Sequence, residues 1–343
     1  MRIRLFDETP AEAASWDAYV LSQPQATNDH LWAWRRILSG AFGFNPYYLG
    51  ALEGERLVGL LPLFQIPRGW GRSALSSIPF GNYGGLCADS DDAARALLGE
   101  AKALLGALGG RYLDLRHRWP FADGGLREQS LYRRFTLPLL SDPALHLQQM
   151  GQNNRKKISR AKRRGLRVVV SRDARQLYPI HAQTARRLGT PCFPRRYFEL
   201  ILEQFGPQAE GQLVACEDRL VAYNLVLYFK DSMVIQLGGA LERFLHDYPN
   251  NLLFWHAIER GCALGLRELD YCRNRVDSGS AHFKRQLHLQ EAPLAYQYYL
   301  PDGQAIPQRH PSNPKYRAAI ALWKQLPLYL TQRLGPPLVR YLA

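Results

Sequence analysis

The pattern of apolar and polar residues changes from a strand period to a helix period, and it does so twice along the chain. In the first half, residues 47–53 and 56–66 predict two strands joined at a glycine turn, and a third strand is expected within 75–86. Alanines and leucines at helical spacing predict a helix over 91–106, and residues 111–117 predict a closing strand. A strand meander followed by a helix that crosses to another strand is a mixed α/β unit.

The second half repeats this order of elements. It predicts strands over 211–217, 219–229 and 232–241, a helix capped by Asn250 or Asn251 and ended by Gly265, and a strand over 267–273.

Short sequence matches support a duplication. ALGGRYLD (107–114) and ALGLRELD (263–270) are identical at six of eight aligned positions. Two further matches occur in the same order, LGALEGERLVG with LVACEDRLVA and YGGL with LGGA. We interpret the chain as a duplicated α/β domain, with domains at 1–150 and 151–305 and a basic amphipathic tail at 306–343.

Composition and charge fit a folded protein with anionic partners. The 343 residues are 46% hydrophobic and carry a formal net charge of +14. The first ten residues, MRIRLFDETP, lack the apolar core of a signal peptide, and no run of eighteen apolar residues predicts a membrane span. Five scattered cysteines lack metal-binding spacing. We therefore expect a cytoplasmic, monomeric protein with reduced cysteines and no metal.

Several segments, taken in order, resemble one enzyme family. They are LWAWRRI, LVGLLPLF and SSIPFGNYGGL in the first half, NNRKKISRAKRRG, YPNNLLFWHAIERG and LDYCRNRVDSGSAHFK in the second, and NPKYRAAIALWKQLP in the tail. In this order they resemble the Fem-type aminoacyltransferases, which build peptidoglycan bridges, and their FemAB-like relatives in exopolysaccharide gene clusters. The resemblance covers most of the chain and implies tandem GNAT-like acyltransferase domains, with the acceptor side first and the donor side second.

The resemblance also implies a reaction. An N-acyltransferase of this kind moves an aminoacyl or acyl group to an amino group of a cell-envelope or exopolysaccharide precursor. The chain departs from the family at YCRN (271–274), where relatives often carry Phe-Gly-Arg-Ser, and at RQLHLQ, where relatives often carry a tryptophan and a glycine. These departures concern substrate choice more than the fold.

The candidate chemistry centres on the loop beyond the last strand. By the resemblance, Lys284, preceded by Phe283, contacts the reacting end of the donor, and we expect it to be the cation at the oxyanion or an adjacent phosphate. A solvated surface lysine is the alternative. Arg273, Asn274 and Arg275 follow the strand end, where guanidinium groups fit a phosphate or compensate nearby aspartates.

Polar residues on predicted strands and in the first half complete the candidate substrate site. Tyr223, Asn224 and Gln236 lie on predicted central strands, where a polar side chain needs a partner. The resemblance assigns the acceptor face to Trp34, Arg36, Asn82 and Tyr83. For Trp34, packing in the core is the alternative.

The donor is left open between two classes, and the alternative to the Fem-type reaction is an acyl-CoA- or acyl-carrier-dependent N-acyltransferase that acts on a small or lipid amine. A Gly-rich turn that opens a helix, the usual coenzyme A signature, is missing, which favours aminoacyl-tRNA over an acyl-CoA or acyl-carrier thioester; no tightly bound cofactor is expected. The basic stretch 153–165 predicts a helix that packs through Ile158 and Ala161 and ends at Gly165. Its Arg155, Lys156 and Arg160 meet tRNA phosphates or face solvent.

Two further questions stay open in the sequence. The tail either docks across the two domains or contacts an anionic membrane as an interfacial segment. A catalytically silent protein that holds RNA or lipid on the same fold is the third functional hypothesis.

Overall fold

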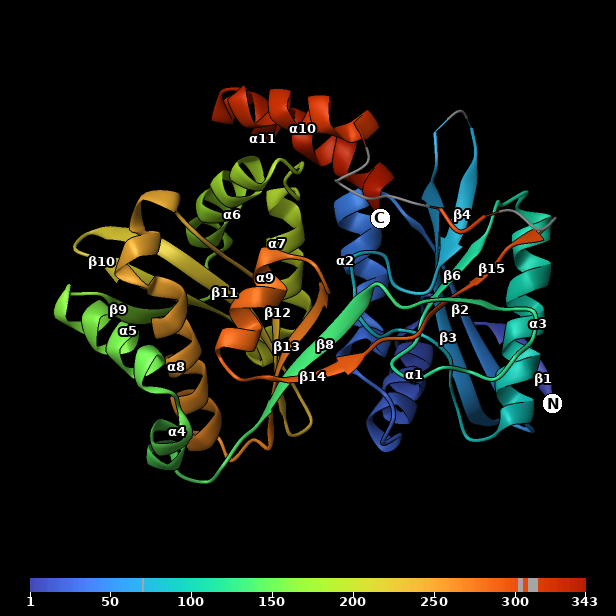
Figure 1. The fold of residues 1–343 in the computed structure, drawn as a ribbon. Coiled ribbons are helices and arrows are strands. Elements are labelled where there is room, and N and C mark those ends of the chain that lie inside the picture. The colour runs from blue at the N-terminus through green and yellow to red at the C-terminus, as the bar shows by residue number, and fades with distance from the viewer. Residues whose placement is uncertain (70, 302–304, 308–313) are drawn as a thin grey trace. The chain divides into compact units, whose positions relative to one another are not determined.

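The computed structural model describes residues 1–69, 71–301, 305–307 and 314–343 (Figure 1). The chain forms two compact units, and each is built around one mixed sheet. The first unit comprises 1–132, the described part of 293–309, and 340–343; the second comprises 133–292 and the described part of 310–339. The sequence placed the boundary after residue 150, whereas the structure places it after residue 132 and returns residues 293–307 to the first unit.

The first unit has helices on both faces of its sheet. The strands run in the order β1-β2-β3-β4-β6-β15-β7, with β5 beside β3. Adjacent residues of β2 point to opposite faces: Leu49 packs with Leu97 of α3, and Tyr48 packs with Trp16 of α1. The elements are β1 (Arg2–Leu5), α1 (Pro10–Ser22), α2 (Ala33–Phe42), β2 (Asn45–Glu53), β3 (Arg56–Pro67), β4 (Ser73–Ser76), β5 (Cys87–Ala88), α3 (Asp91–Ala107), β6 (Leu113–Arg116), β7 (Arg127–Gln129) and β15 (Tyr296–Tyr299).

The second unit repeats this layered arrangement. Its strands run in the order β14-β8-β13-β12-β11-β10-β9. Phe254 of α8 packs with Val226 of β11 on one face, and Phe198 of α7 contacts Tyr223 of β11 on the other. The elements are β8 (Tyr132–Pro138), α4 (Pro143–Gln149), α5 (Gln152–Arg163), β9 (Arg167–Ser171), α6 (Ala174–Leu188), α7 (Arg195–Gln204), β10 (Ala209–Cys216), β11 (Arg219–Phe229), β12 (Ser232–Ala240), the 3-10 helix η3 (Glu242–Asp247), α8 (Pro249–Ala263), β13 (Glu268–Arg275), α9 (Gly279–Gln286), β14 (Gln290–Pro293), α10 (Pro314–Gln325) and α11 (Leu328–Val339).

Most predicted elements are present, with two corrections. Helix α8 begins at Pro249 after Tyr248, not after Asn250 or Asn251, because proline fits the first helical position, where no N–H is needed. The third strand expected within 75–86 is only the short β4, because Pro79 and three glycines turn the following residues into a loop.

The C-terminal helices pack on α6. The indole N–H of Trp323 donates to the Thr190 carbonyl at 3.1 Å, and Gly335 of α11 lies directly against Cys192. These contacts bind α10 and α11 to the second unit, while residues 340–343 belong to the first unit. No helix in the described ranges is long and apolar enough to cross a membrane.

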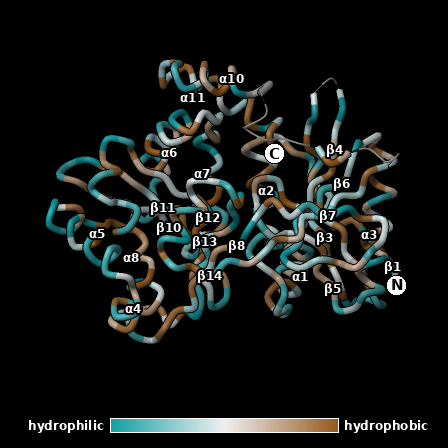
Figure 2. Tube along the Cα trace, viewed as in Figure 1, coloured by the Kyte–Doolittle hydropathy of each residue, from teal (hydrophilic) through white to brown (hydrophobic). Residues whose placement is uncertain are grey.

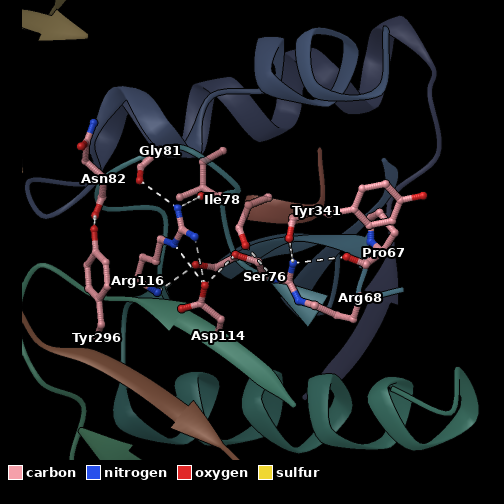
Figure 3. A network of polar contacts seen from close by, with 12 residues as sticks. Pro67, Arg68, Ser76, Ile78, Gly81, Asn82, Asp114, Arg116, Tyr296 and Tyr341 are labelled. Carbon is pink, nitrogen blue, oxygen red and sulfur yellow. Dashed lines mark hydrogen bonds and ion pairs between the residues drawn. The ribbon is translucent and has the colours of Figure 1, made fainter. Parts of the chain in front are cut away.

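In the first unit, the opening between the parallel strands β4 and β6 is closed by a side chain. The ladder ends at the pair Ser76–Asp114, and the Arg116 guanidinium fills the space beyond it (Figure 3). Arg116 donates to the carbonyls of Ile78 and Gly81 at 2.8 and 3.1 Å and lies 3.1 Å from the Asp114 carboxylate. Both side chains of the ion pair are buried, so the guanidinium is part of the interior of the first unit.

We expect Arg116→Met to destabilise the protein by about 3–5 kcal/mol, because it leaves the buried Asp114 carboxylate without its counter-ion. Urea unfolding of the full chain measures the loss. The double variant Arg116→Met/Asp114→Leu should recover most of it, since no unpaired charge remains. A single variant that costs less than about 1 kcal/mol contradicts the structural role of the pair.

Candidate active site

The corresponding strands of the second unit part without being closed. β12 and β13 pair in parallel only as far as Val234 and Asp270. Asp270 fixes this point: one carboxylate oxygen accepts from Arg134 of β8 at 2.9 Å, and the other accepts from the Cys272 amide at 2.7 Å. Cys272 has a φ of +56°, a conformation outside the strand region, so β13 leaves the ladder here. We call the opening beyond this pair the seam.

Buried amide groups without partners lie on both strands of the seam. Gln236 is the extra residue of a bulge in β12, and its side-chain oxygen makes no hydrogen bond. Asn274 of β13 likewise has a buried oxygen without a partner. A buried oxygen without a hydrogen-bond donor costs about 1–3 kcal/mol. The seam is therefore suited to a ligand that donates hydrogen bonds.

Tyr271 and Asn224 stand on the α8 side of the same opening. Burial raises the pKa of Tyr271, and the nearby Asn224 amide offsets part of that rise. Tyr271 therefore keeps its proton at neutral pH. Gly238, which pairs with Asn224 across the ladder, leaves room for the Asn224 amide, because a Cβ at residue 238 would lie 2.7 Å from its oxygen.

Lys284 of α9 is buried beside the seam, so the alternative of a solvated lysine is wrong. Its side chain is 7% exposed, and its ammonium donates to the Tyr271 carbonyl and lies over the Phe135 and Tyr271 rings. Burial lowers the pKa of Lys284 to about 8, partly offset by the charges of Cys272 and Asp270. One N–H is used in the Tyr271 bond, and the ammonium has two more.

The remaining predicted residues of the second unit lie at different depths. Phe283 packs against the core beneath α9. Arg275 pairs with Asp277 at 3.1 Å, as the charge-compensation alternative expected, and the partly buried Arg273 has interactions of its own. Tyr223 is fully buried on the α6 face, where its hydroxyl meets the His181 ring at 3.0 Å.

Of the four predicted acceptor residues, only Arg36 is at the surface. Trp34 belongs to the core of the first unit and donates its indole N–H to the Asn28 carbonyl, which favours the packing alternative. Arg36 is exposed and pairs with Glu8. Asn82 and Tyr83 lie in the loop after β4.

That loop is held rigidly by the first unit. The backbone amides of Asn82 and Tyr83 donate to Asp29 at 2.6 and 2.7 Å, and both side chains are buried. A ligand contact at these four residues stays a prediction.

The basic helix α5 presents an unpaired cationic face. Figure 2 shows α5 in the hydrophilic colour along most of its length. Ile158 and Ala161 are buried, as predicted, and Gly165 follows the helix end with φ +75°. Arg155, Lys156 and Arg160 are exposed and form no ion pair with any described residue.

Basic residues of α5 and the residue that follows it contact the two residues that precede α8. The Arg160 and Lys157 cations lie over the Tyr248 ring at 5.4 and 5.8 Å, and Arg164 pairs with Asp247 at 3.6 Å. On the other side of η3 is an open hollow of about 630 Å³ lined by Gln183, Arg219, Leu220, Leu241, Glu242 and Arg243.

Few backbone amides at this helix start are available to an anion. Pro249 has no N–H, and Asn251 and Leu252 donate theirs to the Tyr248 carbonyl at 3.1 and 3.2 Å. A phosphate at this position would therefore meet side-chain cations rather than a backbone cradle.

Sequence reasoning missed Tyr271, the Arg134–Asp270 pair and Cys272. For Cys272, the internal repeat could have indicated the difference between the two copies. Aligned on the two aspartates, Asp114 and Asp270, the plugging Arg116 of the first copy corresponds to Cys272 of the second. The residue that closes the first copy is thus replaced by a small one in the second.

Comparison with known families identifies the second unit. Residues 149–285 match the family model described as acetyltransferase (GNAT) domain. A comparison with curated proteins gives no match.

Solved structures show the same fold over both units. The chain is similar to the crystal structure of FemX, with a TM-score of 0.67 and 14% identity over 95% of this chain and 100% of that one. It is also similar to the C-terminal domain of a putative lysylphosphatidylglycerol synthetase from Agrobacterium fabrum, with a TM-score of 0.58 and 16% identity over 92% of this chain and 96% of that one. A third similar structure is a tandem GNAT protein from the clavulanic acid biosynthesis pathway, with a TM-score of 0.56 and 13% identity over 89% of this chain and 99% of that one.

These findings define an acyltransferase with a GNAT domain in residues 149–285 and a tandem GNAT-like architecture. The predicted fold class is confirmed.

The free energy of unfolding should depend on pH through Lys284. Its pKa in the folded protein, about 8, is below the unfolded value of 10.5, so the unfolded chain binds more protons between these pH values and stability rises with pH across this window. Relative to Lys284→Met, the wild type should gain on the order of 3 kcal/mol between pH 7 and pH 10.5. Urea unfolding at both pH values tests this, and parallel pH profiles of the two proteins contradict it.

Proposed function

We propose that the protein transfers an aminoacyl or acyl group to an amino group of a cell-envelope or exopolysaccharide precursor, with the chemistry at the seam of the second unit. One observation carries the proposal: β12 and β13 part at Asp270, and the opening holds a buried lysine together with unpartnered amide oxygens. The first unit, closed by Arg116, would contribute to the acceptor side.

The proposed reaction forms one amide bond and breaks one activated acyl bond. The amine nitrogen attacks the acyl carbon, and the bond from that carbon to the donor oxygen or sulfur breaks. The nitrogen loses a proton, which restores the Tyr271 hydroxyl after that hydroxyl has protonated the leaving atom. Gln236 and Asn274 accept hydrogen bonds from N–H groups of the substrates. The Lys284 ammonium stabilises the oxyanion, and the protonated Tyr271 hydroxyl supplies a proton to the leaving atom.

The donor that the surface favours is an aminoacyl-tRNA. The unpaired cations of α5 are spread along a helix, as a polyanion with regularly spaced phosphates requires, and they reach the start of α8. The turn at Tyr248 offers few free amides for a pyrophosphate. An acyl-CoA or acyl-carrier thioester is the second candidate, because it is the usual donor of the GNAT fold and because Arg219 and Arg243 line a hollow on the same edge.

The acceptor and the place of action follow from the same proposal. In this proposal Arg36, an exposed arginine of the first unit that pairs with Glu8, contacts a phosphate of the acceptor. One similar structure is the C-terminal domain of a putative lysylphosphatidylglycerol synthetase, and the lipid in that name fits an acceptor in the envelope. We propose a cytoplasmic enzyme that works at the inner face of the membrane. A silent RNA- or lipid-binding protein is the alternative that a transfer assay excludes.

Lys284→Met should lower the transfer rate about 10²–10³-fold, because it removes a cation from the developing oxyanion. Rates are measured with purified chain, aminoacyl-tRNA or acyl-CoA, and amine acceptors. Lys284→Arg keeps a charge at high pH, so the ratio of wild-type to Lys284→Arg rates should fall above about pH 8. Lys230→Met, at an exposed turn of the same unit, is the control that should leave the rate unchanged. Equal rates for wild type and Lys284→Met would exclude the assigned site.

Ribonuclease treatment of the donor decides between the two donor classes. With an RNA-borne donor, transfer stops, and Arg155→Glu/Lys156→Glu/Arg160→Glu should raise the donor KM at least about tenfold and flatten its salt dependence. Charge reversal of Lys324 and Arg333, equally exposed on α10 and α11, is the matched control. Full activity after ribonuclease, with a thioester supplied, assigns the donor to the second class.

A further inference from the structure

The C-terminal helical hairpin packs on α6 through only part of its surface. The hairpin is residues 314–339, α10 and α11 (Figure 1). Thr331, Gly335 and Val339 are buried and follow one another every four residues, so they form one stripe along α11. Together with the Trp323–Thr190 bond, this stripe holds the hairpin on its unit.

Other large apolar side chains of the same helices are exposed. Leu334 and Leu338 are four residues apart on α11 and are 43% and 45% exposed, and Leu322 of α10 and Tyr329 of α11 are 61% and 67% exposed. Most large apolar side chains of the chain are buried, so four exposed ones within twenty residues are a concentrated surface.

The charges around this apolar surface have one sign. Residues 314–339 contain no Asp or Glu. Arg317, Lys324 and Arg333 are exposed, and none of them forms an ion pair with any described residue. Apolar side chains interleaved with Lys and Arg on a helix that lies flat on its support are the pattern that binds an anionic lipid surface, where the apolar groups enter the interface and the cations meet phosphates.

We propose that the exposed face of α10 and α11 docks the enzyme on an anionic membrane surface. The commitment to lipid rests on the charge: an acidic headgroup layer satisfies three unpaired cations and covers the leucines at once. The short, proline-interrupted helices lie on the surface and do not enter the bilayer core. The inference does not depend on the transfer reaction, because vesicle binding is measured without substrates.

Co-sedimentation of the full chain with vesicles tests the proposal. We expect binding to phosphatidylcholine vesicles that contain 30% phosphatidylglycerol, weakening as salt rises, and little binding to phosphatidylcholine alone. Leu322→Ser/Leu334→Ser/Leu338→Ser and Lys324→Glu/Arg333→Glu should each lower the partition coefficient at least about tenfold while the melting temperature stays unchanged, since all five residues are exposed.

Matched controls separate this face from the other cationic surface. Leu145→Ser/Leu264→Ser removes two comparably exposed leucines of the second unit, and Arg155→Glu/Lys156→Glu removes cations of α5; neither should change vesicle binding. The proposal is overturned if the α5 variant loses binding and the hairpin variants keep it, or if both lipid mixtures bind equally. It is also overturned if the leucine variant instead abolishes a dimer seen by light scattering, which would make a second copy the occupant.

Discussion

One carboxylate determines where the second sheet opens. Asp270 uses one oxygen for the Arg134 guanidinium and the other for the Cys272 amide, so it anchors β13 to β8 and turns its backbone within two residues of the last pair with β12. The rest of the candidate site depends on this turn. The Tyr271 carbonyl accepts a hydrogen bond from the Lys284 ammonium. The side-chain oxygens of Gln236 in β12 and Asn274 in β13 have no hydrogen-bond partner among the described residues. A buried ion pair is weak evidence for stability; here its evident effect is to fix a register.

The duplicated aspartate has opposite consequences in the two copies. In the first, the Asp114 carboxylate is met by Arg116 of its own strand, and that side chain closes the sheet. In the second, the counter-ion comes from β8, and the position of the plugging arginine is a cysteine. The two copies therefore keep the same aspartate with different surroundings: in the second copy it bends β13, and in the first copy the loop after β4 is bound to Asp29.

Sequence patterns were sufficient to predict the sheets and helices, but not the backbone bend and the buried contacts of the candidate site. The helix and strand periods, together with the repeat, led to two mixed sheets and to α5 with its buried Ile158 and Ala161, whereas Lys284 was indicated by the resemblance to the Fem-type enzymes. They failed where a conformation depends on contacts between distant segments. The bend at Cys272 accompanies the bonds of Asp270 to the Cys272 amide and to Arg134 of β8. Periodicity does not indicate such a bend, because a single positive φ leaves the pattern of apolar and polar residues unchanged.

The seam also affects how firmly each copy holds its own backbone. Beyond Val234, the described part of the chain pairs β12 with the strand β11 only, with one further bond from the Thr184 hydroxyl to the Ala240 carbonyl, whereas Arg116 bonds the loop beyond β4 in the first sheet. Backbone with partners on one side opens at lower free energy than backbone paired on both sides, so local stability is distributed unevenly between two similar folds. The copy with fewer strand pairs is also the one with buried side-chain oxygens that lack partners among the described residues. An acyl donor that occupies the seam would complete a hydrogen-bonded sheet, and substrate binding would then resemble the last step of folding.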